Sequence, residues 1–319
     1  MPTLTQLPEQ QTQGHGLRVA ISFGLVYFFW GSTYLAIQIA VQHFPAAALG
    51  SIRFLIGGIP VLAWCALTGK KIAISGREAL KLAVIGVLLL TTGNVVLAWT
   101  EETLNSGLAA MIVAIVPIWV ALIEMAFGGA RLNRRGWTGL LLGMVGLVVL
   151  TWPDLTSGTP IGKRDLLVSL VVMLAAFSWA LGSVCSHRFK VGLHPLASTG
   201  WEMTFAGLVN TLIAAATGGF HRADWSRPGW LAIAYLVVFG SWVGFTAYIW
   251  LLEHVPTPKV ATYAYVNPIV AVFLGWLLHN EQLTWSMFLG MIVIVAAVAL
   301  VTTSKLRTKG SDCRLPASS

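Results

Sequence analysis

The sequence predicts an all-α integral membrane protein in which ten transmembrane helices form two inverted repeats of five, with the N and C termini in the cytoplasm. Three observations lead to this prediction: the composition, the placement of the basic residues and an internal repeat. Of the 319 residues, 56% are hydrophobic and 10% are charged, whereas an ordinary globular domain is about 25% charged. Such a composition is typical of a membrane protein.

Apolar stretches recur along the whole chain, and each is long enough to cross a hydrocarbon layer of about 30 Å as a helix. Short connections rich in Pro, Gly and polar residues separate them. The first stretch is too long for the apolar region of a signal peptide, so we expect it to remain as the first span. The predicted spans are residues 17–41, 46–67, 80–99, 105–127, 136–152, 165–186, 196–217, 229–252, 259–278 and 285–303.

The spans divide the chain into two halves of five spans each. We expect a cytoplasmic tail over residues 1–16, a first half over 17–152 and a periplasmic linker over 153–164. A second half over 165–303 and a cytoplasmic tail over 304–319 follow. This division leaves no room for a soluble domain.

The basic residues predict the orientation, because Lys and Arg accumulate in cytoplasmic loops. With the N terminus inside, the outer connections hold four of the 20 basic residues, Arg53 lies within a span, and the inner connections hold the other fifteen. The net charge of +8 thus reflects topology and contact with anionic lipid. We expect the lipid bilayer, and no nucleic acid, as a partner.

A shift of 151 positions relates the second half to the first. It pairs Gly93 with Gly244 and Pro117 with Pro268. Because five spans is an odd number, the second half enters the membrane upside down relative to the first. Inverted repeats are a hallmark of secondary transporters, whose substrate site lies near the midplane between the repeats. Further pairs, at shifts of 149 to 151, are Trp30 with Trp179, Pro45 with Pro195, Trp99 with Trp250 and Gly139 with Gly290.

Six short motifs occur in a characteristic order: Trp30-Gly-Ser-Thr-Tyr34, Ile52-Arg-Phe-Leu55, Ser106-Gly-Leu-Ala-Ala110, Ser178-Trp-Ala-Leu-Gly-Ser183, the run from Ala261 to Val272, and Glu281. In this order and spacing the chain resembles the drug/metabolite transporter superfamily, specifically EamA-type permeases of the YedA-like branch. The resemblance implies two EamA repeats in a bacterial inner membrane, a central cavity lined by spans 1 to 4 and 6 to 9, and spans 5 and 10 on the outside. Asn280 departs from the glycine that the family often has before Glu281.

Polar and aromatic residues converge on the predicted middle of the membrane, where hydrocarbon offers no hydrogen bonds. We interpret them as candidates for the wall of a substrate cavity, and contacts that hold helices together are the alternative. The first half has Ala114 and Val116 where the second has Tyr265 and Asn267, so we expect the second half to supply more of the polar recognition. The cavity candidates are Trp30, Tyr34, Asn94, Trp179, Trp242, Tyr263, Tyr265 and Asn267.

Two prolines occupy equivalent places in the halves. Pro117 and Pro268 each remove a backbone donor, which kinks a helix. A hinge for alternating access is one interpretation, and a static kink accommodated by packing is the other.

Three charged residues, Arg53, Glu124 and Glu202, lie within predicted spans and each needs a partner or a wet cavity. We expect Glu124 to form a structural ion pair with Arg131, Arg134 or a lysine near the inner end of its span. Arg53 and Glu202 differ in predicted depth by on the order of 10 Å, which argues against a pair. Glu202 is a candidate proton-coupling carboxylate or inner-gate acceptor.

Gly139, Gly143 and Gly146 give one predicted helix a smooth face for close packing, within the monomer or in a homodimer. The function that fits these features is secondary transport of a small-molecule solute by alternating access, with protons or an exchange solute. The resemblance to EamA-type permeases implies amino acids, related metabolites or drugs as the solute, and we expect export. A lipid-linked sugar flippase or a non-transporting subunit is the alternative. A membrane-embedded enzyme is a weaker alternative, because His279-Asn-Glu281 has the wrong spacing for a metal and the sequence has no serine elbow or ATP-binding loop. We expect no cofactor.

Overall fold

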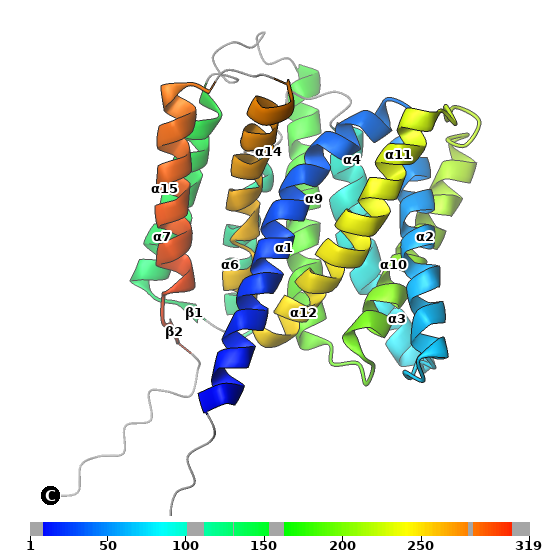
Figure 1. The fold of residues 1–319 in the computed structure, drawn as a ribbon, viewed down its shortest axis with the longest axis horizontal. Coiled ribbons are helices and arrows are strands. Elements are labelled where there is room, and N and C mark those ends of the chain that lie inside the picture. The colour runs from blue at the N-terminus through cyan, green and yellow to red at the C-terminus, as the bar shows by residue number, and fades with distance from the viewer. Residues whose placement is uncertain (1–8, 101–111, 130, 153–162, 280–282, 308–319) are drawn as a thin grey trace, which may run out of the picture.

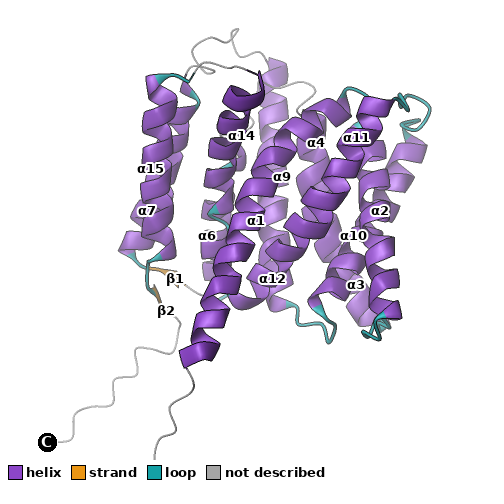
Figure 2. Cartoon of the chain, viewed as in Figure 1, coloured by secondary structure: helices purple, strands orange, loops and turns teal. Residues whose placement is uncertain are grey.

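The computed structural model describes residues 9–100, 112–129, 131–152, 163–279 and 283–307. They form a bundle of long helices (Figure 1), with little other secondary structure (Figure 2). The ends of α1 and α15 that lead to the two termini lie on the same side of the bundle (Figure 1), which we call the terminal side.

The first half contains α1 (Glu9–Val41), α2 (Ala46–Leu67), α3 (Gly76–Gly86), η1 (Val87–Val95), α4 (Val96–Thr100), α6 (Val116–Ala126), β1 (Arg131–Leu132) and α7 (Arg134–Leu150). The second half contains α9 (Lys163–Arg188), α10 (Pro195–Ala216), α11 (Arg227–Tyr235), η2 (Leu236–Phe245), α12 (Thr246–His254), α13 (Thr257–Val260), α14 (Tyr263–His279), α15 (Trp285–Thr302) and β2 (Leu306–Arg307). The two short strands pair antiparallel, which ties the start of α7 to the end of α15.

Six of the described helical segments are long and apolar enough to cross a membrane. They are His15–Val41, Ala46–Leu67, Gly76–Thr100, Leu167–Arg188, Arg227–His254 and Trp285–Thr302. The predicted span 105–127 lies partly outside the described residues. The count of ten spans therefore remains a prediction.

Local sequence signals set several helix ends. Ser75 and Glu78 form a reciprocal capping box at the start of α3, which satisfies backbone N–H groups that the first turn leaves free. Glycines end α2, α6 and α10, because Gly69, Gly128 and Gly218 adopt positive φ angles of 71°, 71° and 66°, which cost a glycine little.

The main packing contacts join the two halves. The α2 helix packs along α10, and α7 packs along α15. The α1 helix packs against α14 and η2, while α9 makes the equivalent contacts with α6 and η1. The contacts that α1 makes with the second half are thus repeated by α9 with the first half. Such an exchange is expected for repeats related by a pseudo-two-fold axis.

Two π-helical segments occupy equivalent places in the halves. A shift of 151 carries η1, Val87–Val95, to positions 238–246, and η2 covers Leu236–Phe245. In a π-helix the hydrogen bonds reach one residue further than in an α-helix, and such segments frequently occur at functional sites. The sequence analysis predicted ordinary helix at both places.

The glycines of α7 pack against the chain itself. A Cβ atom at Gly139 would lie 2.8 Å from Val301, and one at Gly143 would lie 2.8 Å from the Tyr265 ring. A Cβ atom at Gly146 would lie 2.9 Å from Ile294. Of the two interpretations of this face, the structure supports packing within the monomer. A homodimer would need another surface.

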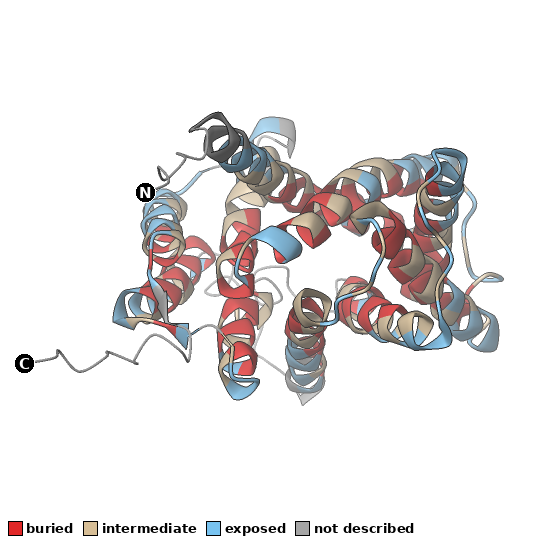
Figure 3. Ribbon diagram, turned by 90° about the horizontal axis from the view of Figure 1, so that it is seen from below, coloured by how far each residue is buried: buried red, intermediate tan, exposed pale blue. Residues whose placement is uncertain are grey.

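Buried residues face the interior of the bundle and exposed residues cover its outer surface (Figure 3). Many of the exposed side chains are large and apolar, including Leu67, Leu212 and Trp285. Such side chains suit contact with lipid, where no hydrogen-bonding group is needed on the outer surface.

Candidate functional site

A narrow cavity of about 70 Å³ lies between the two halves. Six of the eight cavity candidates line it, and they come from both halves. The structure adds Arg53, which the sequence analysis had placed only among the intramembrane charges. The polar and aromatic lining residues are Trp30, Thr33, Tyr34, Arg53, Phe54 and Asn94 from the first half and Trp179, Ser241, Phe245, Tyr263 and Asn267 from the second.

The two π-helical segments carry the groups that hold Arg53. Arg53 Nε donates to Ser241 Oγ on η2 at 3.2 Å, and Nη1 donates to Asn94 Oδ1 on η1 at 3.1 Å. The guanidinium thereby joins a helix of the first half to one of the second. Its side chain also stacks over Phe54, with Cζ 5.1 Å from the ring centroid, within the range of a cation–π contact.

Aromatic side chains form a cluster against the cavity. Trp30 lies 5.5 Å from Trp179, 4.8 Å from Tyr248 and 5.0 Å from Tyr263 between ring centroids. Trp30 Nε1 also donates to the carbonyl of Gly240 at 3.1 Å. Sequence reasoning missed Tyr248, whose only signal was a tyrosine within an apolar span.

Each repeat-related tryptophan packs on a glycine of the other half. A Cβ atom at Gly244 would lie 2.5 Å from Trp30 Nε1, and one at Gly93 would lie 2.8 Å from the Trp179 ring. Both glycines belong to the π-helical segments. The absent side chain at these positions is what allows the indoles to approach the opposite half.

Asn267 reaches the cavity from α14. Its side chain is 3% exposed, and its Oδ1 atom has no hydrogen-bond partner among the described residues. Val116, its counterpart at a shift of 151, also lines the cavity. At this pair of positions the polar residue belongs to the second half. Across the whole lining, however, Thr33, Tyr34, Arg53 and Asn94 come from the first half, so the expectation that the second half supplies more of the polar recognition stays a prediction.

The structure places two of the candidates elsewhere. Tyr265 is fully buried against α7, and its hydroxyl donates to the carbonyl of Leu140 at 3.0 Å. On a helix, Asn267 lies about 40° from Tyr263 around the axis, whereas Tyr265 lies about 200° away. Tyr263 and Asn267 therefore share the cavity face and Tyr265 faces away. Trp242 does not line the cavity either; it is exposed on the outer surface, and its Nε1 donates to the carbonyl of Gly57 at 2.8 Å.

The two prolines have different local structures. Pro117 lies in the first turn of α6, where its missing N–H has no role in the helix, so within the described residues it kinks no continuous helix. Pro268 lies inside α14, and the chain breaks earlier, between α13 and α14. The expected symmetry of the two kinks does not hold.

Comparison with known proteins identifies the fold's relatives. The EamA-like transporter family matches residues 18–152 and 166–303. The chain belongs to this family. Because the family matches twice, the EamA protein described here is a membrane transporter built of two EamA repeats.

Named relatives place this EamA protein in the inner membrane. It is 36% identical over 281 residues to YedA, an uncharacterized inner membrane transporter of Escherichia coli strain K12, with 88% of this chain and 89% of YedA covered. It is 23% identical over 294 residues to YoaV, an uncharacterized transporter of Bacillus subtilis strain 168, with 92% and 99% covered. A solved crystal structure with 18% identity has the same fold, at a TM-score of 0.76 over 89% of this chain and 96% of that chain.

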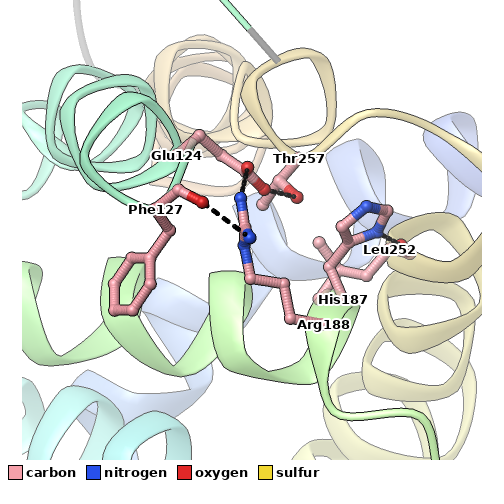
Figure 4. A network of polar contacts seen from close by, with 6 residues as sticks. All are labelled: Glu124, Phe127, His187, Arg188, Leu252 and Thr257. Carbon is pink, nitrogen blue, oxygen red and sulfur yellow. Dashed lines mark hydrogen bonds and ion pairs between the residues drawn. The ribbon is translucent and has the colours of Figure 1, made fainter. Parts of the chain in front are cut away.

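A polar network on the terminal side of the EamA protein also joins the halves (Figure 4). Glu124 of α6 forms an ion pair with Arg188 of α9, with 2.8 Å between Oε2 and Nη2. Thr257 donates to Glu124 Oε1 at 3.0 Å, and Arg188 donates to the carbonyl of Phe127 at 3.1 Å. The expected ion pair is present, but its cation comes from the other half rather than from Arg131 or Arg134.

Glu202 lies in a second pocket of about 330 Å³, which Arg53 does not line. This pocket contains residues at the end of α9, the start of α10 and the end of α12. The Glu202 side chain is 1% exposed and its Oε2 atom has no hydrogen-bond partner among the described residues. Arg53 and Glu202 thus face different spaces and form no ion pair. The other titratable residues that line the pocket are Lys190, Glu253 and His254.

Proposed function

We propose that this EamA protein is a secondary transporter that exports amino acids, related metabolites or drugs by alternating access around the cavity between its halves. The observation that supports this most strongly is the cavity itself, because both repeats line it with aromatic and hydrogen-bonding groups. Substrate sites of transporters with inverted repeats lie at this junction.

The lining of the cavity suits a small organic solute. The cavity volume of about 70 Å³ is below the range of about 300 to 1,000 Å³ that is usual for small-molecule sites, so the proposal requires the halves to move apart when a solute enters. Most of the lining is apolar, with a few polar groups, and such a mixture lets apolar surface supply affinity while the polar groups fix orientation.

Alternating access requires that contacts between the halves open on one side at a time. The ion pair of Glu124 and Arg188 is one contact between the halves, on the terminal side. The aromatic cluster around Trp30 is a second contact between the halves, beside the cavity. We propose that Pro268 allows α14 to bend as these contacts change, since its ring removes a helix hydrogen bond. Pro117, at a helix start, has no such role in this proposal.

We further propose that Glu202 couples transport to protons, with an exchange solute as the alternative driving force. Its carboxyl group is buried in a polar pocket without a hydrogen bond to Oε2. Lys190, Glu253 and His254 face the same pocket. Intramembrane carboxylates of this kind commonly take part in proton relays.

The proposed topology has ten spans, both termini in the cytoplasm, and repeats over residues 17–152 and 165–303. Reporter fusions at residues 158 and 319 test it: a periplasm-active reporter should work only at the first position, and activity at the second would contradict the orientation.

Counterflow in proteoliposomes tests the transport function. Purified protein is reconstituted with a high internal concentration of unlabelled amino acids, and uptake of labelled amino acids is followed. A transporter should accumulate label transiently above the level of empty liposomes. A panel of amino acids, related metabolites and cationic drugs that gives no accumulation would contradict the proposal.

A further inference from the structure

Arg53 is the one charged side chain among the described residues that line the cavity. It belongs to α2 and is 6% exposed. A buried charge normally has a partner of opposite charge, because burial removes the water that stabilises it. The partners of Arg53 therefore indicate whether it serves the fold or the site.

The described partners of Arg53 are neutral. Its guanidinium donates to Ser241 Oγ and Asn94 Oδ1, and no described carboxylate lies within ion-pair distance. In the described part of the chain, the ion pair that involves an arginine joins Arg188 to Glu124. The contrast with Arg188 is informative: the arginine outside the cavity has a carboxylate, and the arginine in the cavity wall has none.

The repeat shows that the fold does not require a cation here. The shift of 150 that pairs Pro45 with Pro195 pairs Arg53 with Met203. Met203 is fully buried in α10. An apolar side chain thus fills the equivalent place in the other half, and helix packing alone does not account for a guanidinium.

The polar groups around Arg53 are likewise confined to one of each equivalent pair. At a shift of 151, Asn94 corresponds to Phe245 and Ser241 corresponds to Leu90. Phe245 and Leu90 also line the cavity. The polar members gather around the guanidinium, and their counterparts are apolar. The cavity therefore has a polar region around Arg53 and an apolar wall elsewhere.

We propose that Arg53 binds the carboxylate of the transported solute, an inference that rests on the transport function proposed above. The planar guanidinium matches a carboxylate in a bidentate geometry. One positive charge suits one carboxylate, whereas a phosphate dianion would bring a second charge without a counter-ion into the cavity. Asn267 Oδ1, which lacks a partner among the described residues, accepts an N–H of the same solute.

The chemical class is accordingly a small carboxylate with an apolar or aromatic body, and α-amino acids fit it best. Their carboxylate suits Arg53, their ammonium group suits Asn267, and an apolar side chain suits the walls formed by Trp30 and Trp179. Organic cations without a carboxylate do not fit, because they would meet the positive charge of Arg53.

Gly240 gives a way to move the guanidinium without removing its charge. A Cβ atom at this position would lie 2.7 Å from Arg53 Nη2, closer than two such atoms can pack. Gly240→Ala therefore displaces the side chain of Arg53 while leaving it cationic. This variant supplements Arg53→Gln, because Arg53→Gln removes a buried charge and thereby changes the stability of the protein as well as its binding site.

The test compares three matched probes: L-phenylalanine, 3-phenylpropionate, which lacks the amine, and 2-phenylethylamine, which lacks the carboxylate. Binding to purified wild-type protein, Arg53→Gln and Gly240→Ala is measured by thermal stabilisation at increasing ligand concentrations, and transport by counterflow. Arg222→Gln, in the exposed loop before α11, is the control. Monodisperse elution in size-exclusion chromatography selects folded variants.

Wild-type protein and Arg222→Gln should bind the two carboxylates at least about tenfold more tightly than the amine, since a hydrogen bond to a charged group carries that much free energy. Arg53→Gln should abolish this preference and Gly240→Ala should weaken it. The inference is wrong if wild-type protein binds neither carboxylate or binds the amine as tightly. It is also wrong if folded Arg53→Gln or folded Gly240→Ala keeps the full preference.

The outcomes separate this inference from the transport function. Carboxylate binding that depends on Arg53, without counterflow of any probe, supports the inference and contradicts transport. Counterflow that Arg53→Gln leaves unchanged supports transport and contradicts the inference.

Discussion

Replacing Arg188 should destabilise the protein, because it leaves a buried carboxylate without its cation. The Glu124 side chain is 4% exposed and that of Arg188 is 31% exposed. Breaking a fully buried pair by removing one partner costs about 3 to 5 kcal/mol, whereas an exposed pair contributes about 0 to 1 kcal/mol. For a pair with one buried and one partly exposed member we expect Arg188→Gln to cost about 2 kcal/mol, which is between these limits.

The matched change on the other side of the pair should cost less. Glu124→Gln removes the buried charge itself and keeps an oxygen that accepts from Thr257. The double variant should therefore lose less stability than the two single losses added together, with a coupling of about 1 to 2 kcal/mol, as is usual for residues in direct contact. The control is Arg134→Gln, an exposed arginine at the start of α7 that should change stability by no more than about 0.5 kcal/mol.

Stability is measured as the free energy of unfolding in mixed micelles with increasing SDS, with thermal unfolding in detergent as a second readout. Equal stabilities of Arg188→Gln and Arg134→Gln would refute the reasoning, because they would mean that the carboxylate needs no cation. Additive losses in the double variant would refute it as well, since additivity means that the two side chains act independently.

Three further predictions concern residues around the cavities. Glu202→Gln should abolish the pH dependence of counterflow, and a profile like that of the wild-type protein would exclude proton coupling through this residue. Pro268→Ala should reach the membrane at wild-type levels and transport more slowly, so equal rates at equal expression would remove the hinge. Tyr265→Phe should lower the free energy of unfolding by about 1 kcal/mol, since it loses the hydrogen bond to Leu140, and solute affinity should stay unchanged. Tyr263→Phe is the comparison variant within the cavity. A change of solute affinity in Tyr265→Phe alone would contradict the assigned faces of α14.

Composition and the repeat were sufficient to predict the membrane class and the two halves, because both depend on properties summed over many residues. The lining of the cavity needed finer information. Tyr263, Tyr265 and Asn267 occupy nearly the same depth, and depth was the criterion that selected them. Rotation around α14 decides which of them meets the cavity, and a helix that is apolar on every side gives little signal of its rotation.

The π-helical segments were not predictable for a different reason. Their sequences, Val87–Val95 and Leu236–Phe245, mix apolar residues with a few small or polar ones, and no residue in them forbids α-helix. What distinguishes them is tertiary: Gly93 and Gly244 receive indoles from the opposite half. The partner of Glu124 was missed for the same reason, since Arg188 is 64 residues away in sequence and comes close only when the halves pack.

The inverted repeat links these successes and failures. Pseudo-symmetry fixes where a residue and its counterpart lie, so a sequence shift alone identifies pairs such as Asn267 with Val116 or Arg53 with Met203. A symmetric cavity could not distinguish the two ends of a solute, whereas each of these pairs places a polar group on one side only. The positions at which the repeat is broken by charge or hydrogen bonding are therefore where recognition is expected, and the positions at which it is kept, such as Gly93 with Gly244, are where the halves must pack and move in the same way.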